Sequence, residues 1–191
     1  GGSEIVTCCC SSSSCSFFID KRQFQMEIQS ESIDPLLLSQ MEASLNEAAT
    51  AIDTLYLVDV VTMRTLSRPP EKIKMIGKAL CILFKVKPVR IPDPANPSKH
   101  IEDYWGPTKK LLSNSNIINM LIHFDRENIE AKTLRILKEE FFNNPQFTYE
   151  EMLKVSKAAA GFYKWINGTV TYYEIFKQIT ARRVEIEGPQ V

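Results

Sequence analysis

The chain has 191 residues, of which 44% are hydrophobic and 24% charged, as is usual for a folded protein and unlike a disordered one. Lysine plus arginine and aspartate plus glutamate number 23 each, so no overall field favours nucleic acid or a membrane surface. No apolar run approaches the roughly 20 residues of a membrane-spanning helix. We therefore expect neither nucleic acid nor a membrane as a partner, and any electrostatic binding must come from a local patch.

Residues 1–32 differ in composition from the rest of the chain. Four of the five cysteines crowd into the serine tract CCCSSSSCS: Cys8, Cys9, Cys10 and Cys15. Adjacent cysteines are poor zinc ligands and no histidine lies near, so a metal site is disfavoured, and palmitoylation is an equally weak alternative. We predict a low-complexity leader that is disordered or non-native. An odd cysteine count without a dispersed framework indicates a reducing compartment inside the cell.

Residues 33–66 are predicted to form a helical strand with a coiled-coil seam. Its apolar residues recur at steps of three and four, the a/d spacing of a heptad repeat: Leu38, Met41, Leu45, Ala48, Ile52 and Leu55. Asp34-Pro35 marks the helix start, because aspartate caps a helix and proline suits its first turn. Asp59 interrupts the pattern, so we expect a less regular seam beyond Leu55.

A second seam lies in residues 161–187, followed by a tail at 188–191. It has the same spacing: Phe162, Trp165, Thr169, Tyr172, Phe176 and Ile179. Two seams in one chain can pair as an antiparallel hairpin and hold the intervening residues at its tip. The sequence therefore predicts an all-α protein, in which a coiled-coil stalk segment is capped by a small bundle of about six helices.

Residues 67–160 are predicted to form this tip domain. Ser67-Arg68-Pro69-Pro70 ends the first strand, because proline has no N–H to donate and restricts the residue before it. In the next helix, predicted over 70–84, an apolar stripe faces one way and three lysines face the other: Lys74, Lys78 and Lys85. A row of this kind is most simply a solvated face.

The segment 86–102 contains four prolines and no periodicity, so we predict a long surface loop with neither helix nor strand. Short helical patterns follow, including one over 129–142. The last of them begins at Thr148, with Glu151 three residues on as a capping box. No segment shows the alternation of a β-strand.

A search for catalytic chemistry gives no site. Gly77-Lys78 lacks the upstream glycine of a phosphate-binding loop. His100 and His123 have no metal-ligand spacing to a cysteine or carboxylate. Cys81 is flanked by leucine and isoleucine, which favours a buried thiol over a nucleophile. We predict no enzyme active site, no metal and no cofactor.

Three motifs occur in order: SRPPEKIKMIGKALCILFKVKP, EDYWGPTKKLL and KAAAGFYKWINGTVTYYEIFKQI. Together they resemble the distal stalk and microtubule-binding domain of dynein heavy chains, over Ala43 to Arg183. The stretch VRIPDPANPSKHIEDYWGPTKKLL is more similar to axonemal (ciliary) dyneins than to cytoplasmic ones. The resemblance implies two antiparallel coiled-coil strands that project from a ring ATPase and carry a small helical domain that grips the microtubule. It also implies that the chain is a fragment of a longer motor, with a short stalk.

The resemblance also implies roles for individual residues. It assigns microtubule contacts to basic residues, with an acidic residue that tempers affinity: Lys74, Lys78, Lys154, Lys157 and Glu150. Pro69 and Pro70 match the prolines that end the outgoing strand, and Trp165 matches a tryptophan at the junction with the returning strand. Asn114 stands where cytoplasmic relatives have an arginine, so one tubulin contact is expected to be weaker or missing.

We therefore predict the microtubule-binding tip of a dynein motor, monomeric as a fragment and located in the cytoplasm, on the cytoskeleton of the ciliary axoneme. The register of the stalk would control its affinity, while the motor's ATPase activity would lie outside this chain. Two alternatives remain. One is a coiled-coil module that binds another protein's helix through a free seam. The other is a small helical enzyme that uses Cys81 as nucleophile.

Overall fold

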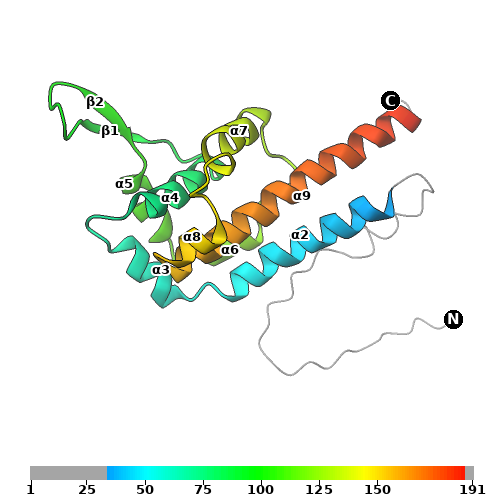
Figure 1. Ribbon diagram of the computed structural model, residues 1–191, viewed down its shortest axis with the longest axis horizontal. Coiled ribbons are helices and arrows are strands. Elements are labelled where there is room, and N and C mark those ends of the chain that lie inside the picture. Colours follow the sequence, from blue (N-terminus) through cyan, green and yellow to red (C-terminus); the bar gives the residue numbers. More distant parts are fainter. Residues whose placement is uncertain (1–33, 188–191) are drawn as a thin grey trace. The chain divides into compact units, whose positions relative to one another are not determined.

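The computed structural model describes residues 34–187, all of which belong to one compact unit. The predicted leader (1–32) and tail (188–191) lie outside the described residues. Helices dominate the structure, which confirms the predicted fold class with one addition, a small two-stranded sheet. Figure 1 shows the order of the elements and the two long helices, α2 and α9, side by side.

The stalk segment is the pair of α2 (Pro35–Asp53) and α9 (Lys157–Glu187). The helices are antiparallel, because contacts between them run in opposite order along the two helices: Asp34 meets Arg182, Ser44 meets Gly168 and Leu55 meets Gly161. Four residues of the predicted seam are buried, Met41, Ala48, Ile52 and Leu55, whereas Leu38 and Leu45 are only partly buried. Ser44 and Ala51, which the heptad did not include, are buried as well. The predicted cap is also present, since Asp34 Oδ1 accepts a hydrogen bond from Leu36 N at 2.9 Å.

The outgoing strand is interrupted earlier than the sequence predicts. Helix α2 ends at Asp53, and α3 (Leu57–Arg64) starts after an extended residue, Tyr56, with φ −79° and ψ 134°. Both the N–H and the hydroxyl of Thr54 donate to Ala51 O, which closes the last turn of α2. The chain therefore turns between the helices, so Leu55 stays buried while Leu57 and Val58 become exposed. The expected helix over 33–66 is thus two helices.

The tip domain is built around α4 (Glu71–Leu83), which contacts α5 (Trp105–Leu112), α8 (Tyr149–Leu153), α9 and the π-helical turn η1 (Leu137–Phe142). Its apolar stripe is buried as predicted, with Ile73, Ile76 and Leu80 fully enclosed. Between α5 and α8 lie α6 (Ile117–Ile122), α7 (Ala131–Ile136) and η1. The predicted capping at Thr148 is confirmed, because its Oγ1 accepts from Glu151 N at 3.2 Å.

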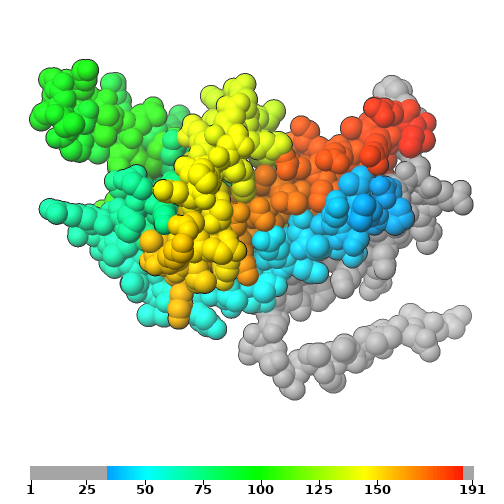
Figure 2. Space-filling model, viewed as in Figure 1, coloured from blue at the N-terminus to red at the C-terminus, as the bar shows by residue number. Residues whose placement is uncertain are grey.

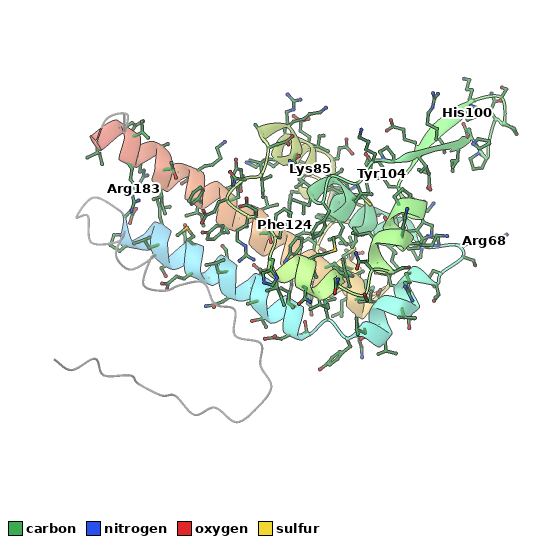
Figure 3. The ribbon with its side chains drawn as sticks, turned by 180° about the vertical axis from the view of Figure 1, so that it is seen from behind. Arg68, Lys85, His100, Tyr104, Phe124 and Arg183 are labelled. Atoms are coloured by element: carbon green, nitrogen blue, oxygen red, sulfur yellow. The ribbon has the colours of Figure 1, made fainter. Side chains whose placement is uncertain are left out.

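The prediction of a structureless loop over 86–102 is wrong. Val89–Pro92 (β1) and His100–Asp103 (β2) pair as an antiparallel hairpin, with Ile91 opposite Ile101. Valine and isoleucine suit strands, and the prolines are accommodated because they lie at strand ends and in the turn. Asp93 N donates to Lys99 O at 2.9 Å and closes that turn. The hairpin, which carries His100, extends away from the helices (Figure 3).

Candidate functional site

The predicted contact residue Lys74 lies near the start of α4 with its side chain 45% exposed. Its Nζ is 3.3 Å from Glu71 Oε1 on the preceding turn. Pro70 precedes the helix, and its carbonyl accepts from both Ile73 N and Lys74 N, which fixes the first turn of α4. The double proline therefore sets the direction in which α4, and with it Lys74, leaves the end of α3.

A three-residue charge cluster joins α4 to α8. Glu151 accepts a hydrogen bond from Lys72 Nζ at 2.5 Å through Oε2, and one from Lys154 through Oε1. These two bonds, the one from Lys154 first, lower the pKa of Glu151 to about 2. The cluster positions Lys154, a predicted contact residue, close to the helix that carries Lys74. Lys154 keeps 66% of its side chain exposed.

Two more predicted residues lie close to the cluster in the chain. Glu150 is exposed in the first turn of α8, and Lys157 is exposed as the first residue of α9. Three of the predicted lysines, Lys74, Lys154 and Lys157, thus lie where α4, α8 and the start of α9 meet. In Figure 2 the chain from α8 into α9 (yellow to orange) is exposed beside α3 and the end of α2 (cyan).

Lys78 occupies a different environment from the other three lysines. Its Nζ is 2.6 Å from Glu140 Oε2 of η1. It also lies 5.5 Å from the ring centroid of Tyr104 and 5.8 Å from that of Phe141. This ammonium therefore holds α4, the start of α5 and η1 together through an ion pair and two cation–π contacts. Lys72, by contrast, belongs to the charge cluster and points from α4 toward Glu151 of α8.

Trp165 lies at the centre of the domain and is fully buried. Its ring stacks on Phe84 at 5.7 Å between centroids and meets the edge of Phe124 at 5.3 Å. Its Nε1 donates to Leu121 O at 3.3 Å. Phe124 and Lys85, which follows Phe84, are both visible in Figure 3. The predicted junction tryptophan thus connects α9 to the end of α4 and to the segment after α6.

Three features of this end of the molecule were not predicted from the sequence. Lys72 was missed because its partner Glu151 is 79 residues away and only the packing of α4 on α8 brings them together. An apolar patch on α3, with four side chains at least 42% exposed, was missed because residues beyond Leu55 were expected to continue the stalk helix: Tyr56, Leu57, Val58 and Val61. The exposed lysines of α5, Lys109 and Lys110, were quoted within a motif and not considered as contacts.

Asn114 follows α5 and is exposed. Its Oδ1 accepts from Asn116 N at 2.9 Å, and its Nδ2 lies 3.5 Å from Met120 Sδ. The amide thus shapes the turn between α5 and α6, a role that the long side chain of an arginine could not fill in the same way.

The alternative of a cysteine enzyme finds no support in the described residues. Cys81 is fully buried, its Sγ lies 3.5 Å from Thr108 Oγ1, and burial raises the pKa of its thiol. A buried and protonated thiol is a poor nucleophile.

Within residues 34–187 no three histidine, cysteine or carboxylate side chains gather to hold a metal ion. In the same part of the chain no helix is both long and apolar enough to cross a membrane.

Fold and site together define a class of protein: an antiparallel helical stalk segment that presents a small helical domain with exposed lysines at its far end. The family described as the microtubule-binding stalk of dynein motors matches residues 24–190. The chain belongs to this family, as its sequence motifs imply.

Relatives and a solved structure agree with this assignment. Human dynein axonemal heavy chain 3 is 33% identical over 146 residues, which are 76% of this chain and 4% of that protein. The dynein-1-beta heavy chain of the flagellar inner arm I1 complex from Chlamydomonas reinhardtii is 29% identical over 147 residues, 77% of this chain and 3% of that protein. The solved microtubule-binding domain of dynein-c is 27% identical with a TM-score of 0.63, over 74% of this chain and 92% of that structure. The chain thus spans only a small part of its curated heavy-chain relatives.

Proposed function

We propose that residues 34–187 are the tip of an axonemal dynein stalk and bind microtubules through the end of the domain where α4, α8 and α9 meet. The contact residues are Lys74, Lys154 and Lys157, with Glu150 as an acidic residue that limits affinity. The observation that carries the proposal is the charge cluster, because Glu151 holds Lys154 at the helix that carries Lys74.

The position of this surface suits a stalk tip. Lys157 is the first residue of α9, whose 31 residues extend about 45 Å at 1.5 Å per residue. The basic residues therefore lie at one end of the helix, and the part that would continue toward a motor lies at the other. Each exposed ion pair contributes up to about 1 kcal/mol, so binding is expected to be reversible and to weaken with salt.

The lysines differ in their expected contribution to microtubule binding. Lys74 is readily available, since its one ion pair is to a neighbouring residue that is itself 81% exposed. Lys78 adds to the positive potential but is held by Glu140 and two rings, so its contribution to binding is smaller. The apolar patch on α3 offers a non-polar contact beside these charges.

Affinity is proposed to depend on the register of α2 against α9. A slide of α2 would act on α3 and then, through Pro69 and Pro70, on the direction of α4. Such coupling requires two alternative packings of the stalk, each with its own affinity for the partner. In the cell the parent motor would act on the cytoskeleton of the axoneme, and its ATPase would reside in another part of that protein.

A coiled-coil module with a free seam is less well supported. Helices α2 and α9 bury each other's seam residues, so little of the heptad surface is left for a partner helix. We accordingly propose a monomer, which analytical ultracentrifugation would test.

The decisive experiment is co-sedimentation of the chain with microtubules at several salt concentrations. Binding should weaken as salt rises, and Lys74→Glu should abolish it while circular dichroism shows unchanged helicity. Lys132→Glu is the matched control, because Lys132 is exposed on α7 outside this surface. If Lys74→Glu binds like the unmodified chain, the assigned surface is wrong.

A further inference from the structure

A groove lies between the hairpin and α5, apart from the charge cluster of α4 and α8. Its volume is about 540 Å³, within the range of roughly 300–1,000 Å³ found for ligand-binding pockets. It is lined by the chain after α4, by β1 and by one side of α5: Val86, Lys87, Val89, Gly106, Pro107, Lys110, Leu111 and Asn114. The two walls come from segments that the sequence predicts as a surface loop and a separate helix.

The groove is lined mostly by apolar residues, with two charged side chains among them. Valine, proline and leucine make most of it apolar, and Gly106 leaves room because it has no side chain. A Cβ added there would lie 4.0 Å from Val89 Cγ2, so the two residues face each other. The charged members are two exposed lysines, Lys87 and Lys110.

These two lysines have no acidic counterpart in the groove. Neither forms an ion pair with another residue of the described chain, in contrast to Lys72, Lys78 and Lys85. No aspartate or glutamate belongs to the lining. The nearest acidic residues along the chain are otherwise engaged.

Asp103 and Glu102 at the base of the hairpin illustrate this. Asp103 Oδ2 accepts from Gly106 N at 3.0 Å and Oδ1 accepts from Trp105 N at 3.3 Å, so its carboxylate caps α5. Glu102 stands opposite Arg90 in the strand register, where an opposite charge already faces it. Asp103 keeps its negative charge beside Gly106, but neither it nor Glu102 forms an ion pair with Lys87 or Lys110, so the two ammonium groups of the groove outnumber the one carboxylate beside it.

We infer that this groove binds an extended acidic peptide segment of the filament, with one apolar side chain in the groove and carboxylates at Lys87 and Lys110. The charge complementarity selects an acidic occupant, and the apolar lining between the two ammonium groups selects a peptide over a small anion. The inference rests on the proposed function for the identity of the partner. It adds a second contact, at the hairpin side of α5, to the surface at α4 and α8.

The test uses a short fluorescein-labelled glutamate peptide with one central phenylalanine, added to the ¹⁵N-labelled chain. Anisotropy should show binding that weakens with salt, and the amide resonances of Gly106, Leu111 and Asn114 should shift. Replacing the phenylalanine by serine should weaken binding. The double variant Lys87→Glu, Lys110→Glu should weaken it about tenfold or more, as the loss of two charge contacts would.

The matched control is Lys99→Glu, Lys132→Glu, which makes the same change of net charge at exposed positions outside the groove. The inference is overturned if both double variants weaken the peptide equally, or if the resonances that shift belong to α4 and α8. These assays contain no microtubules. A negative result with the peptide beside loss of co-sedimentation in Lys74→Glu would therefore reject the groove and leave the proposed function in place.

Discussion

Gly168 of α9 lies directly against the backbone of Ser44 in α2. A Cβ at position 168 would be 2.6 Å from Ser44 O and 2.9 Å from Ala48 N. Both neighbours are backbone atoms, which cannot move away without displacing the helix. The two stalk helices therefore approach closely where α9 has no side chain, and this contact favours one alignment of α2 on α9.

Gly168→Ala should destabilise the stalk pairing. The methyl group would force the helices apart at a cost of about 1–3 kcal/mol, which exceeds the gain of up to about 1 kcal/mol in helix propensity. Thermal unfolding followed by circular dichroism should show a lower Tm. Gly106→Ala is the control, because a Cβ there would meet its nearest neighbour at 3.4 Å, and its Tm should be unchanged or slightly higher. An unaltered Tm in Gly168→Ala would contradict the close approach.

Tyr172 ties α9 to the segment between α6 and α7. Its hydroxyl donates to Glu127 Oε1 at 2.8 Å, and its pKa is raised, first by burial and then by this carboxylate. Tyr172→Phe should lower the free energy of unfolding by about 1.5–3 kcal/mol, as expected for a hydrogen bond to a charged group. Urea denaturation measures the change. Tyr173→Phe should have little effect, since among the described residues the Tyr173 hydroxyl has no hydrogen-bond partner.

Local patterns in the sequence were sufficient to predict most helices. Heptad spacing identifies α2 and α9, and the side chains of Asp34 and Thr148 identify two helix starts, because caps and periodicity act over a few residues. The hairpin was missed because its four-residue strands are short and its prolines resemble those of a loop. Strand pairing depends on a partner eight or more residues away, which periodicity does not report.

The site was harder to predict than the fold. The exposed lysines could be named from helical spacing, but their partners could not, since Glu151 and Glu140 belong to other helices. Which lysines are available for a partner depends on those pairings. Packing of α4 against α8 and η1 decides them, and that packing is a property of the whole domain.

Lys78→Met should affect stability more than binding. Methionine keeps the apolar stem between Tyr104 and Phe141 but removes the ion pair with Glu140, so the free energy of unfolding should fall by about 1 kcal/mol. Co-sedimentation with microtubules should weaken less than in Lys74→Met, whose effect on stability should be smaller. The opposite order of the two variants in binding would show that Lys78 contacts the filament directly.

Glu151→Gln should loosen the domain and tighten binding to microtubules. The amide carries no charge, so Lys72 and Lys154 lose their shared partner and the positive potential of the surface rises. Co-sedimentation should therefore show higher affinity at low salt, with the difference shrinking as salt rises. Glu139→Gln, an exposed carboxylate without an ion pair to a described residue, controls for the change in net charge.

The stability effect of Glu151→Gln should depend on pH with a definite sign. Because the pKa of Glu151 is lowered from 4.5 to about 2 in the folded chain, its charged form stabilises the fold above pH 4.5. That contribution is lost as pH falls through this window toward 2, where the carboxyl becomes neutral like the glutamine. The variant should therefore unfold at a lower Tm than the unmodified chain at pH 7, and the two Tm values should converge near pH 2. A difference in Tm that stays constant across this range would mean that the two lysines do not lower the pKa of Glu151.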